Sequence, residues 1–185
     1  MGKITKEQRQ ELVRIRSAGV LEEVKPHYLD LSHGAIIVPC SDGDQMDDLY
    51  VHMREVCKGQ LPEPRLHTLA LNGGAPLMSG DWPDPRPGEV LVSMVMEARD
   101  LKQIGTAILF SHAPCGAAAK NSYSVEHMIN LLILAKSRLK TDCRDFRVIC
   151  FFHVDWDNGS EGGERKQRTY FISRSRWLDY LQRGK

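Results

Sequence analysis

The chain has 185 residues, with 25 Lys and Arg against 24 Asp and Glu, so its formal net charge at pH 7 is +1. This balance, without any recognisable nucleic-acid-binding module, gives no basis for a nucleic-acid or acidic-membrane partner. No apolar run is long enough to cross a bilayer, and the first residues lack the apolar core of a signal peptide. We therefore expect a cytoplasmic protein that binds neither membrane nor nucleic acid.

The five cysteines are odd in number and widely spread. Disulfide-built domains carry an even number at close spacings, so this pattern does not indicate a disulfide framework. The thiols are expected to be reduced and available to a metal ion.

The N-terminal third begins with a predicted amphipathic helical arm, over about residues 5–18, that packs against the body or a second subunit. A connection over 19–26 and a short extended segment at Leu29–Leu31 follow. A strand is predicted at 35–38 and a helix at 45–57, whose apolar spacing assigns Met46, with Leu49, to the core.

The remaining elements alternate between short apolar runs and longer segments with helical periodicity. A Gly-, Pro- and Asp-rich loop is expected over 78–88, and a turn over 116–122. The predicted strands are 66–71, 106–110, 146–154 and 169–173, and the predicted helices are 89–103, 125–140 and 174–183.

Strands that alternate with helices indicate an α/β fold, with a mainly parallel sheet flanked by helices. The last two strands are joined by a loop instead of a helix, so an antiparallel edge strand is compatible with the pattern. The length suits one domain, and we predict that residues 1–185 form a single domain.

The most informative stretch runs from Ala107 to Ala117, where an apolar run ends at His112, Pro114 and Cys115. A polar cluster after a buried parallel strand lies at its carboxyl end, where open α/β sheets place their sites. The spacing of His112 and Cys115 allows both side chains to reach one metal ion.

A second half-site follows the strand at 35–38, where Cys40 and Asp42 are two residues apart. In an extended chain both side chains point the same way. Two strand ends therefore offer two thiolates, one imidazole and one carboxylate, and such soft and borderline ligands favour zinc. The alternatives are buried structural thiols with a satisfied histidine, and for Asp42 a helix N-cap.

Two further features accompany the half-sites. Asn72-Gly73-Gly74 follows the strand at 66–71, and is either a tight turn or a place where backbone N–H groups line the site. Asp44 is a general base, a supporting carboxylate or a surface charge. The other histidines, His52 and His153 among them, are predicted to be structural.

The order Cys-x-Asp, a strand ending in Asn-Gly-Gly, a helix, and a strand ending in His-x-x-Cys-Gly resembles the β-class carbonic anhydrases, over about residues 35–119. The resemblance implies that Cys40, His112 and Cys115 hold zinc, and that Asp42 leaves or occupies the fourth position. It implies a zinc-bound hydroxide that attacks carbon dioxide, or a related small electrophile, and a homodimer or higher oligomer. We assign substrate contacts to Asn72, Gly73 and Gly116, and a catalytic part to Asp42 and Asp44.

The chain departs from this family pattern at one position. The family reads Cys-x-Asp-x-Arg, and the arginine holds the aspartate away from zinc, whereas Asp44 stands here. Either Asp42 closes the zinc site, or another cation, such as Arg65, Arg99 or Lys120, replaces the arginine. A closed site would make the chain a non-catalytic or repurposed relative. A cysteine-nucleophile enzyme is a third and more distant hypothesis.

Overall fold

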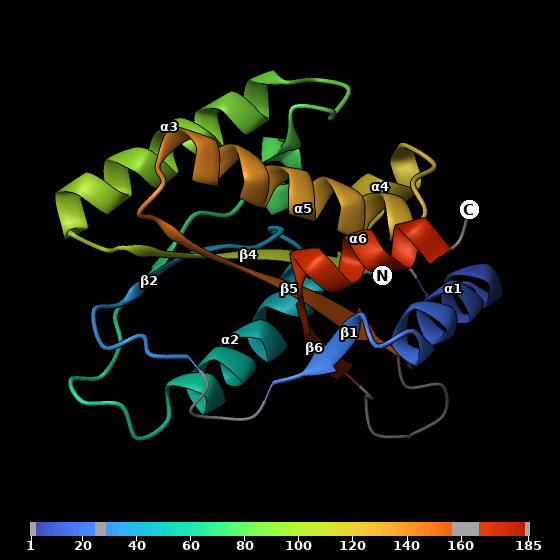
Figure 1. Cartoon of the computed structure of the whole chain (residues 1–185), viewed down its shortest axis with the longest axis horizontal. Helices are drawn as coiled ribbons and strands as arrows, with labels where there is room; N and C mark the ends of the chain where they lie inside the picture. Colours follow the sequence, from blue (N-terminus) through green and yellow to red (C-terminus); the bar gives the residue numbers. More distant parts are fainter. Residues whose placement is uncertain (1–2, 25–28, 157–166, 184–185) are drawn as a thin grey trace.

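The computed structural model describes residues 3–24, 29–156 and 167–183. A sheet of six strands lies at its centre, in the order β1-β6-β5-β4-β2-β3 (Figure 1). The strands are β1 (Leu21–Glu23), β2 (Ala35–Val38), β3 (Leu66–Thr68), β4 (Thr106–Ala113), β5 (Arg147–Asp155) and β6 (Gln167–Ile172).

Seven helical segments surround the sheet among the described residues. None of them is long and apolar enough to span a bilayer. They are α1 (Lys6–Ser17), α2 (Gly43–Cys57), the 3-10 helix η1 (Ala75–Ser79), α3 (Arg86–Lys102), α4 (Gly116–Lys120), α5 (Val125–Asp142) and α6 (Arg174–Arg183).

The sheet is mostly parallel, as the sequence predicts. Strands β3, β2, β4 and β5 pair in parallel, while β6 pairs antiparallel with β5, and β1 pairs antiparallel with β6. The α/β class, the flanking helices and the antiparallel edge are thereby confirmed.

Each face of the sheet has its own hydrophobic core. Helices α3 and α5 cover one face, and α2 covers the other (Figure 1). Every residue of β2 is fully buried, as expected for a central parallel strand with helices on both sides. In β4 the side chains alternate, so that Leu109 enters the α3/α5 core and Phe110 enters the α2 core.

The sheet has a topological switch point between β2 and β4. After β2 the chain passes through α2 to β3 on one side, whereas after β4 it passes through α5 to β5 on the other side. In open α/β sheets the crevice beyond the carboxyl ends of two such strands is the usual place for a ligand site. A ligand site is therefore expected at the residues after Val38 and at the end of β4.

Strand β4 is three residues longer than predicted. The ladder with β5 continues through His112, opposite His153, and ends at Ala113 opposite Val154. Ser111 and His112 are buried polar residues inside this strand. The predicted strand ended at Phe110 because the apolar run ends there. Backbone pairing, however, does not require an apolar side chain.

Four other local predictions were wrong. The predicted connection at 19–26 contains β1, and the predicted turn at 116–122 contains α4. Leu29 and Leu31 are buried but belong to no strand, and the loop at 78–88 is shortened by η1 and by the earlier start of α3. Elements of three to five residues carry too few positions to show a period, so neighbouring strands and helices decide them.

Two helices show which faces are buried. In α1 the side chains of Leu12 and Ile15 are fully buried, so the arm packs against its own body. In α2 the buried residues include Gln45 and Leu49, whereas Met46 is only partly buried. The prediction that Met46 belongs to the core of α2 was therefore wrong. The neighbouring polar residue, Gln45, is buried instead.

Candidate metal centre

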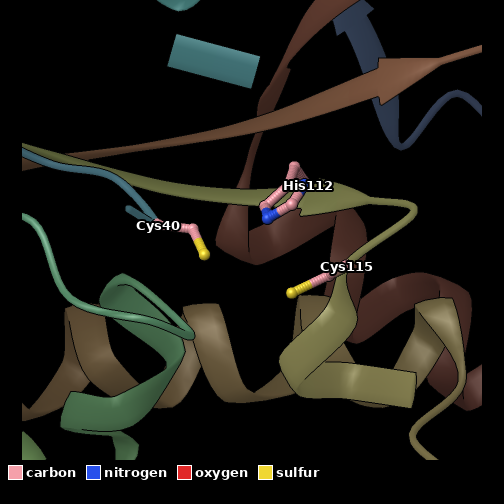
Figure 2. A group of neighbouring side chains, drawn as sticks. All are labelled: Cys40, His112 and Cys115. Carbon is pink, nitrogen blue, oxygen red and sulfur yellow. The ribbon is translucent and has the colours of Figure 1, made fainter. Parts of the chain in front are cut away.

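Cys40, His112 and Cys115 converge at the carboxyl ends of β2 and β4. Cys40 follows β2, His112 belongs to β4, and Cys115 precedes α4, and Figure 2 shows their side chains directed toward a common space. One donor atom from each residue lies within 4.8 Å of the other two. The three side chains are 8%, 5% and 4% exposed, respectively. Cys40 of one predicted half-site thus lies close to both residues of the other, His112 and Cys115.

The donor set fits zinc. With Zn–S about 2.3 Å and Zn–N about 2.0 Å, tetrahedral ligand atoms lie roughly 3.5 to 3.8 Å apart, inside the observed limit of 4.8 Å. Neither ring nitrogen of His112 has a hydrogen-bond partner, although both are buried. A buried imidazole without a partner is costly, and a bound cation would compensate it. Two sulfurs and one imidazole leave a fourth position open, as in catalytic zinc sites.

The two thiols ionise unequally. A hydrogen bond with Cys115, assisted by burial, raises the pKa of Cys40 to about 12. The same bond lowers the pKa of Cys115 to about 7, assisted by the backbone N–H groups of Ala118 and Ala117. Cys115 is therefore the first thiolate to form, with the Cys40 S–H donating to it. Both protons must leave when a metal binds.

The glycine pair after β3 makes close contact with this cluster. The Gly73 backbone N–H donates to Cys40 Sγ over 3.2 Å. Gly74 has φ of +62°, and a Cβ there would lie 2.6 Å from the backbone nitrogen of Cys40. At both positions the turn lies directly against Cys40. These two glycines therefore do more than permit a tight turn. By contrast, a Cβ at Gly116 would meet nothing within 4 Å.

A pocket of about 670 Å³ opens next to the cluster and reaches Cys40. Asn72 and Gly116 line it, as does Lys120, and Asn72 accepts a hydrogen bond from Ser41 Oγ over 2.8 Å. The loop at 80–85, whose role the sequence left undefined, forms part of the wall. The whole lining is Cys40, Asp42, Asn72, Trp82, Pro83, Asp84, Gly116, Ala117, Lys120 and Asn121.

Asp42 lies on the wall of this pocket as the N-cap of α2. Its Oδ1 accepts a hydrogen bond from the backbone N–H of Asp44 over 3.1 Å. It is not one of the donors that converge within 4.8 Å, and its role as a metal ligand stays a prediction. Asp44 is exposed in the first turn of α2, and its catalytic role also stays a prediction.

The three cations suggested as substitutes for the family arginine lie in different places. The backbone of Arg65 pairs with Ala35, at the opposite end of β2. Arg99 pairs with Asp100 and lies over the ring of Phe146. Lys120, at the end of α4, is the member of this group that lines the pocket.

Sequence reasoning placed neither of two buried polar residues beside the cluster, although it named His153 as structural. Gln45 lies on the inner face of α2, and His153 lies opposite His112 in the β4–β5 ladder. A signal for Gln45 was its position four residues before Leu49, on the same helix face. The position of His153 could be known only from the strand register.

No family model matches the chain, and no curated protein matches it. Among solved structures, a carbonic anhydrase from Streptococcus mutans is similar to 92% of this chain and to 100% of its own, with 13% sequence identity and a TM-score of 0.48. The β-carbonic anhydrase CafA of the fungal pathogen Aspergillus fumigatus is similar to 97% of this chain and 92% of its own, with 14% identity and a TM-score of 0.39.

Proposed function

We propose that the chain is a zinc-dependent lyase of the β-carbonic anhydrase type, which hydrates carbon dioxide to bicarbonate. The observation that carries the proposal is the convergence of Cys40, His112 and Cys115 at the switch point, beside an open pocket. A structural zinc site has four protein ligands and is closed, whereas a catalytic site keeps a position for water. Three converging donors next to a pocket correspond to the second arrangement.

Cys40, His112 and Cys115 would hold the ion. Bound zinc supplies a Lewis acid that lowers the pKa of its water from 15.7 to about 7. The Gly73 N–H stabilises negative charge on the sulfur of Cys40, because a hydrogen bond to the charged form favours that form. The β2 and β4 strand ends hold the three donors in place before any ligand arrives.

Asp42 would orient the attacking water from the pocket wall. In the family pattern an arginine holds this aspartate, and Asp44 cannot do so with its side chain. Here the Asp44 backbone N–H holds Asp42 Oδ1 at the amino end of α2, where the partial positive charge of the helix also favours a carboxylate. We propose that the helix terminus performs the task of the missing arginine.

The pocket wall would handle substrate and product. Lys120 places a positive charge at the pocket, which suits bicarbonate, the anionic product. Asn72, whose Oδ1 accepts a hydrogen bond from Ser41 Oγ, lines the same space, as does Gly116. Carbon dioxide is uncharged and needs no such ionic contact.

A specific observation also favours the non-catalytic alternative. Within the described residues Asp42 forms no ion pair with an arginine or lysine, so the single N-cap bond retains it. If that bond breaks on metal loading, Asp42 closes the fourth position and the zinc becomes structural.

One experiment separates these possibilities: stopped-flow carbon dioxide hydration on protein whose zinc content is determined in the same preparation. We expect one zinc per chain and activity at neutral pH. Stoichiometric zinc without activity at neutral and alkaline pH would support the closed site. Absence of zinc would overturn both.

Assembly and location remain predictions. We expect a homodimer or a higher homo-oligomer, which sedimentation at several protein concentrations would test. The cytoplasmic location and the single-domain organisation are expected from the sequence.

A further inference from the structure

A small buried cavity lies behind His112, on the α2 face of the sheet. Its volume is about 10 Å³, and its wall includes three polar side chains, those of Gln45, His112 and His153. Apolar side chains, including Leu49 and Phe110, complete the lining. A cavity of about this size holds one water molecule if at least two polar groups face it.

The polar groups around this cavity have unsatisfied hydrogen-bonding capacity. Gln45 Oε1 and His153 Nε2 are buried and have no partner, and both ring nitrogens of His112 are in the same condition. Gln45 and His153 are only 5% and 3% exposed. A metal ion would occupy one nitrogen of His112, which still leaves one unpaired atom on each of Gln45, His112 and His153, besides Ser111 Oγ, which is also buried without a partner. Each unpaired buried polar group costs roughly 1 to 3 kcal/mol, so a shared partner would be strongly favoured.

We propose that one internal water in this cavity links His112 to Gln45 and His153, which makes Gln45 and His153 positioning residues for the metal ligand. The water accepts from the N–H of His112 and donates to Gln45 Oε1 and His153 Nε2. This assigns the proton of His153 to Nδ1, which then donates to Thr169 Oγ1 over 2.8 Å. The remaining unpaired atoms of Gln45, His112 and His153 each gain one partner.

The link would fix the ring orientation and tautomer of His112. A metal-bound imidazole usually donates its other N–H to a carboxylate, a carbonyl or a water, and loss of that partner weakens metal binding about 10- to 100-fold. The inference rests on the proposed metal centre, but it assigns a role to residues outside the ligand set. This role accounts for a polar residue at position 45, on the buried face of α2, where an apolar residue is usual.

The first test is zinc affinity, measured by competition with a chelator, in Gln45→Leu and in the matched control Met46→Leu. Both residues line the cavity, and both changes introduce leucine, a helix former of similar size. We expect Gln45→Leu to bind zinc about 10- to 100-fold more weakly, and Met46→Leu to bind like the wild type. Gln45→Leu should keep the melting temperature of the zinc-free protein, because a buried apolar side chain replaces a buried amide whose oxygen has only the water as its partner. A purely structural role would instead lower that temperature and leave zinc affinity intact.

A second pair of variants tests the shared water. Gln45→Glu retains an acceptor and should keep zinc affinity within about threefold of the wild type, far above that of Gln45→Leu. Gln45→Leu and His153→Leu should together weaken binding by less than the product of their separate effects, because both act through one water. Wild-type protein that binds zinc, with Gln45→Leu binding equally well, would overturn this inference alone. Wild-type protein that binds no zinc would instead overturn the proposed function.

Discussion

Two regions near the carboxyl ends of β4 and β5 contain buried imidazole nitrogens without hydrogen-bond partners, yet they differ in their chemistry. In the metal cluster, Cys40, His112 and Cys115 bring three donors within 4.8 Å. The histidine pocket, about 390 Å³ in volume, is lined by His52 and His153 on the α2 side. Among the described residues, no third metal-ligating donor joins these two within that distance. Convergence of donors, more than burial of any one of them, distinguishes a metal site.

The charge states of the two regions differ as well. Burial lowers the pKa of His52 to about 4 and that of His153 to about 3, so both are neutral at pH 7. The thiols share a proton, and Cys115 ionises readily at neutral pH. The metal cluster thus prepares a negative charge for a cation, while the histidine pocket avoids charge.

The largest effect should come from removing one donor of the metal cluster. Cys115→Ser should abolish tight zinc binding, because zinc prefers the thiolate and the site loses one of three ligands. At free zinc of 1,000 times Kd, the wild type should gain about 4.1 kcal/mol in its free energy of unfolding, and the variant almost none. Thermal melts with and without zinc measure this difference. Cys57→Ser, at the end of α2, is the control, and an equal loss there would contradict the site.

The next effect concerns the turn that touches Cys40. Gly74→Ala should destabilise the fold by about 2 to 5 kcal/mol, because the position has a positive φ and its Cβ would collide with backbone atoms of Cys40. Gly116→Ala lines the same pocket without such contacts and should change stability by less than about 0.5 kcal/mol. Urea unfolding of the two zinc-free variants makes the comparison. Similar losses in both would show that the close approach of Gly74 is unimportant.

The histidine pocket should make the free energy of unfolding fall as the pH is lowered. Because the pKa of His52 is depressed in the folded chain, only the unfolded chain binds a proton there between pH 6.5 and about 4. The contribution of neutral His52 to the free energy of unfolding is therefore complete above pH 6.5 and is lost as the pH falls through this window. His52→Phe should therefore lose about 1 to 2 kcal/mol less than the wild type between pH 7.5 and pH 5. Denaturant unfolding at both pH values measures this. An unchanged pH dependence would mean that His52 is not held neutral by burial.

The smallest expected effect concerns the cation on the pocket wall. Lys120→Met should raise KM for bicarbonate dehydration about two- to fivefold, because a partly solvated ion contact contributes only about 0.4 to 1 kcal/mol. The kcat should change less, and Lys102→Met, at the far end of α3, should leave both unchanged. Steady-state dehydration kinetics supply both constants. A loss confined to kcat would assign Lys120 to a different role.

Much of the fold was readable from local patterns. The all-apolar run of β2, the apolar run 107–110 in β4 and the helical spacing in α5 identify central strands and a buried helix, because burial on both sides requires such sequences. The pairing of Cys40 with the His112–Cys115 segment was also predictable, since both follow predicted parallel strands. What local pattern could not give was the extension of β4 through Ser111 and His112, where pairing with β5 overrides side-chain polarity.

The sequence by itself determined which residues offer zinc-type ligands, and that two apolar strands deliver them to one edge of a sheet. Only the tertiary structure decided that Lys120 lines the pocket while Arg65 and Arg99 do not, and that Asp42 is held by the amino end of α2. It also decided that Gln45 and His153 line one cavity with His112. The physical reason is that ligand type and strand period are properties of neighbouring residues. The surroundings of a ligand, in contrast, are set by register and helix rotation, which join segments about a hundred residues apart.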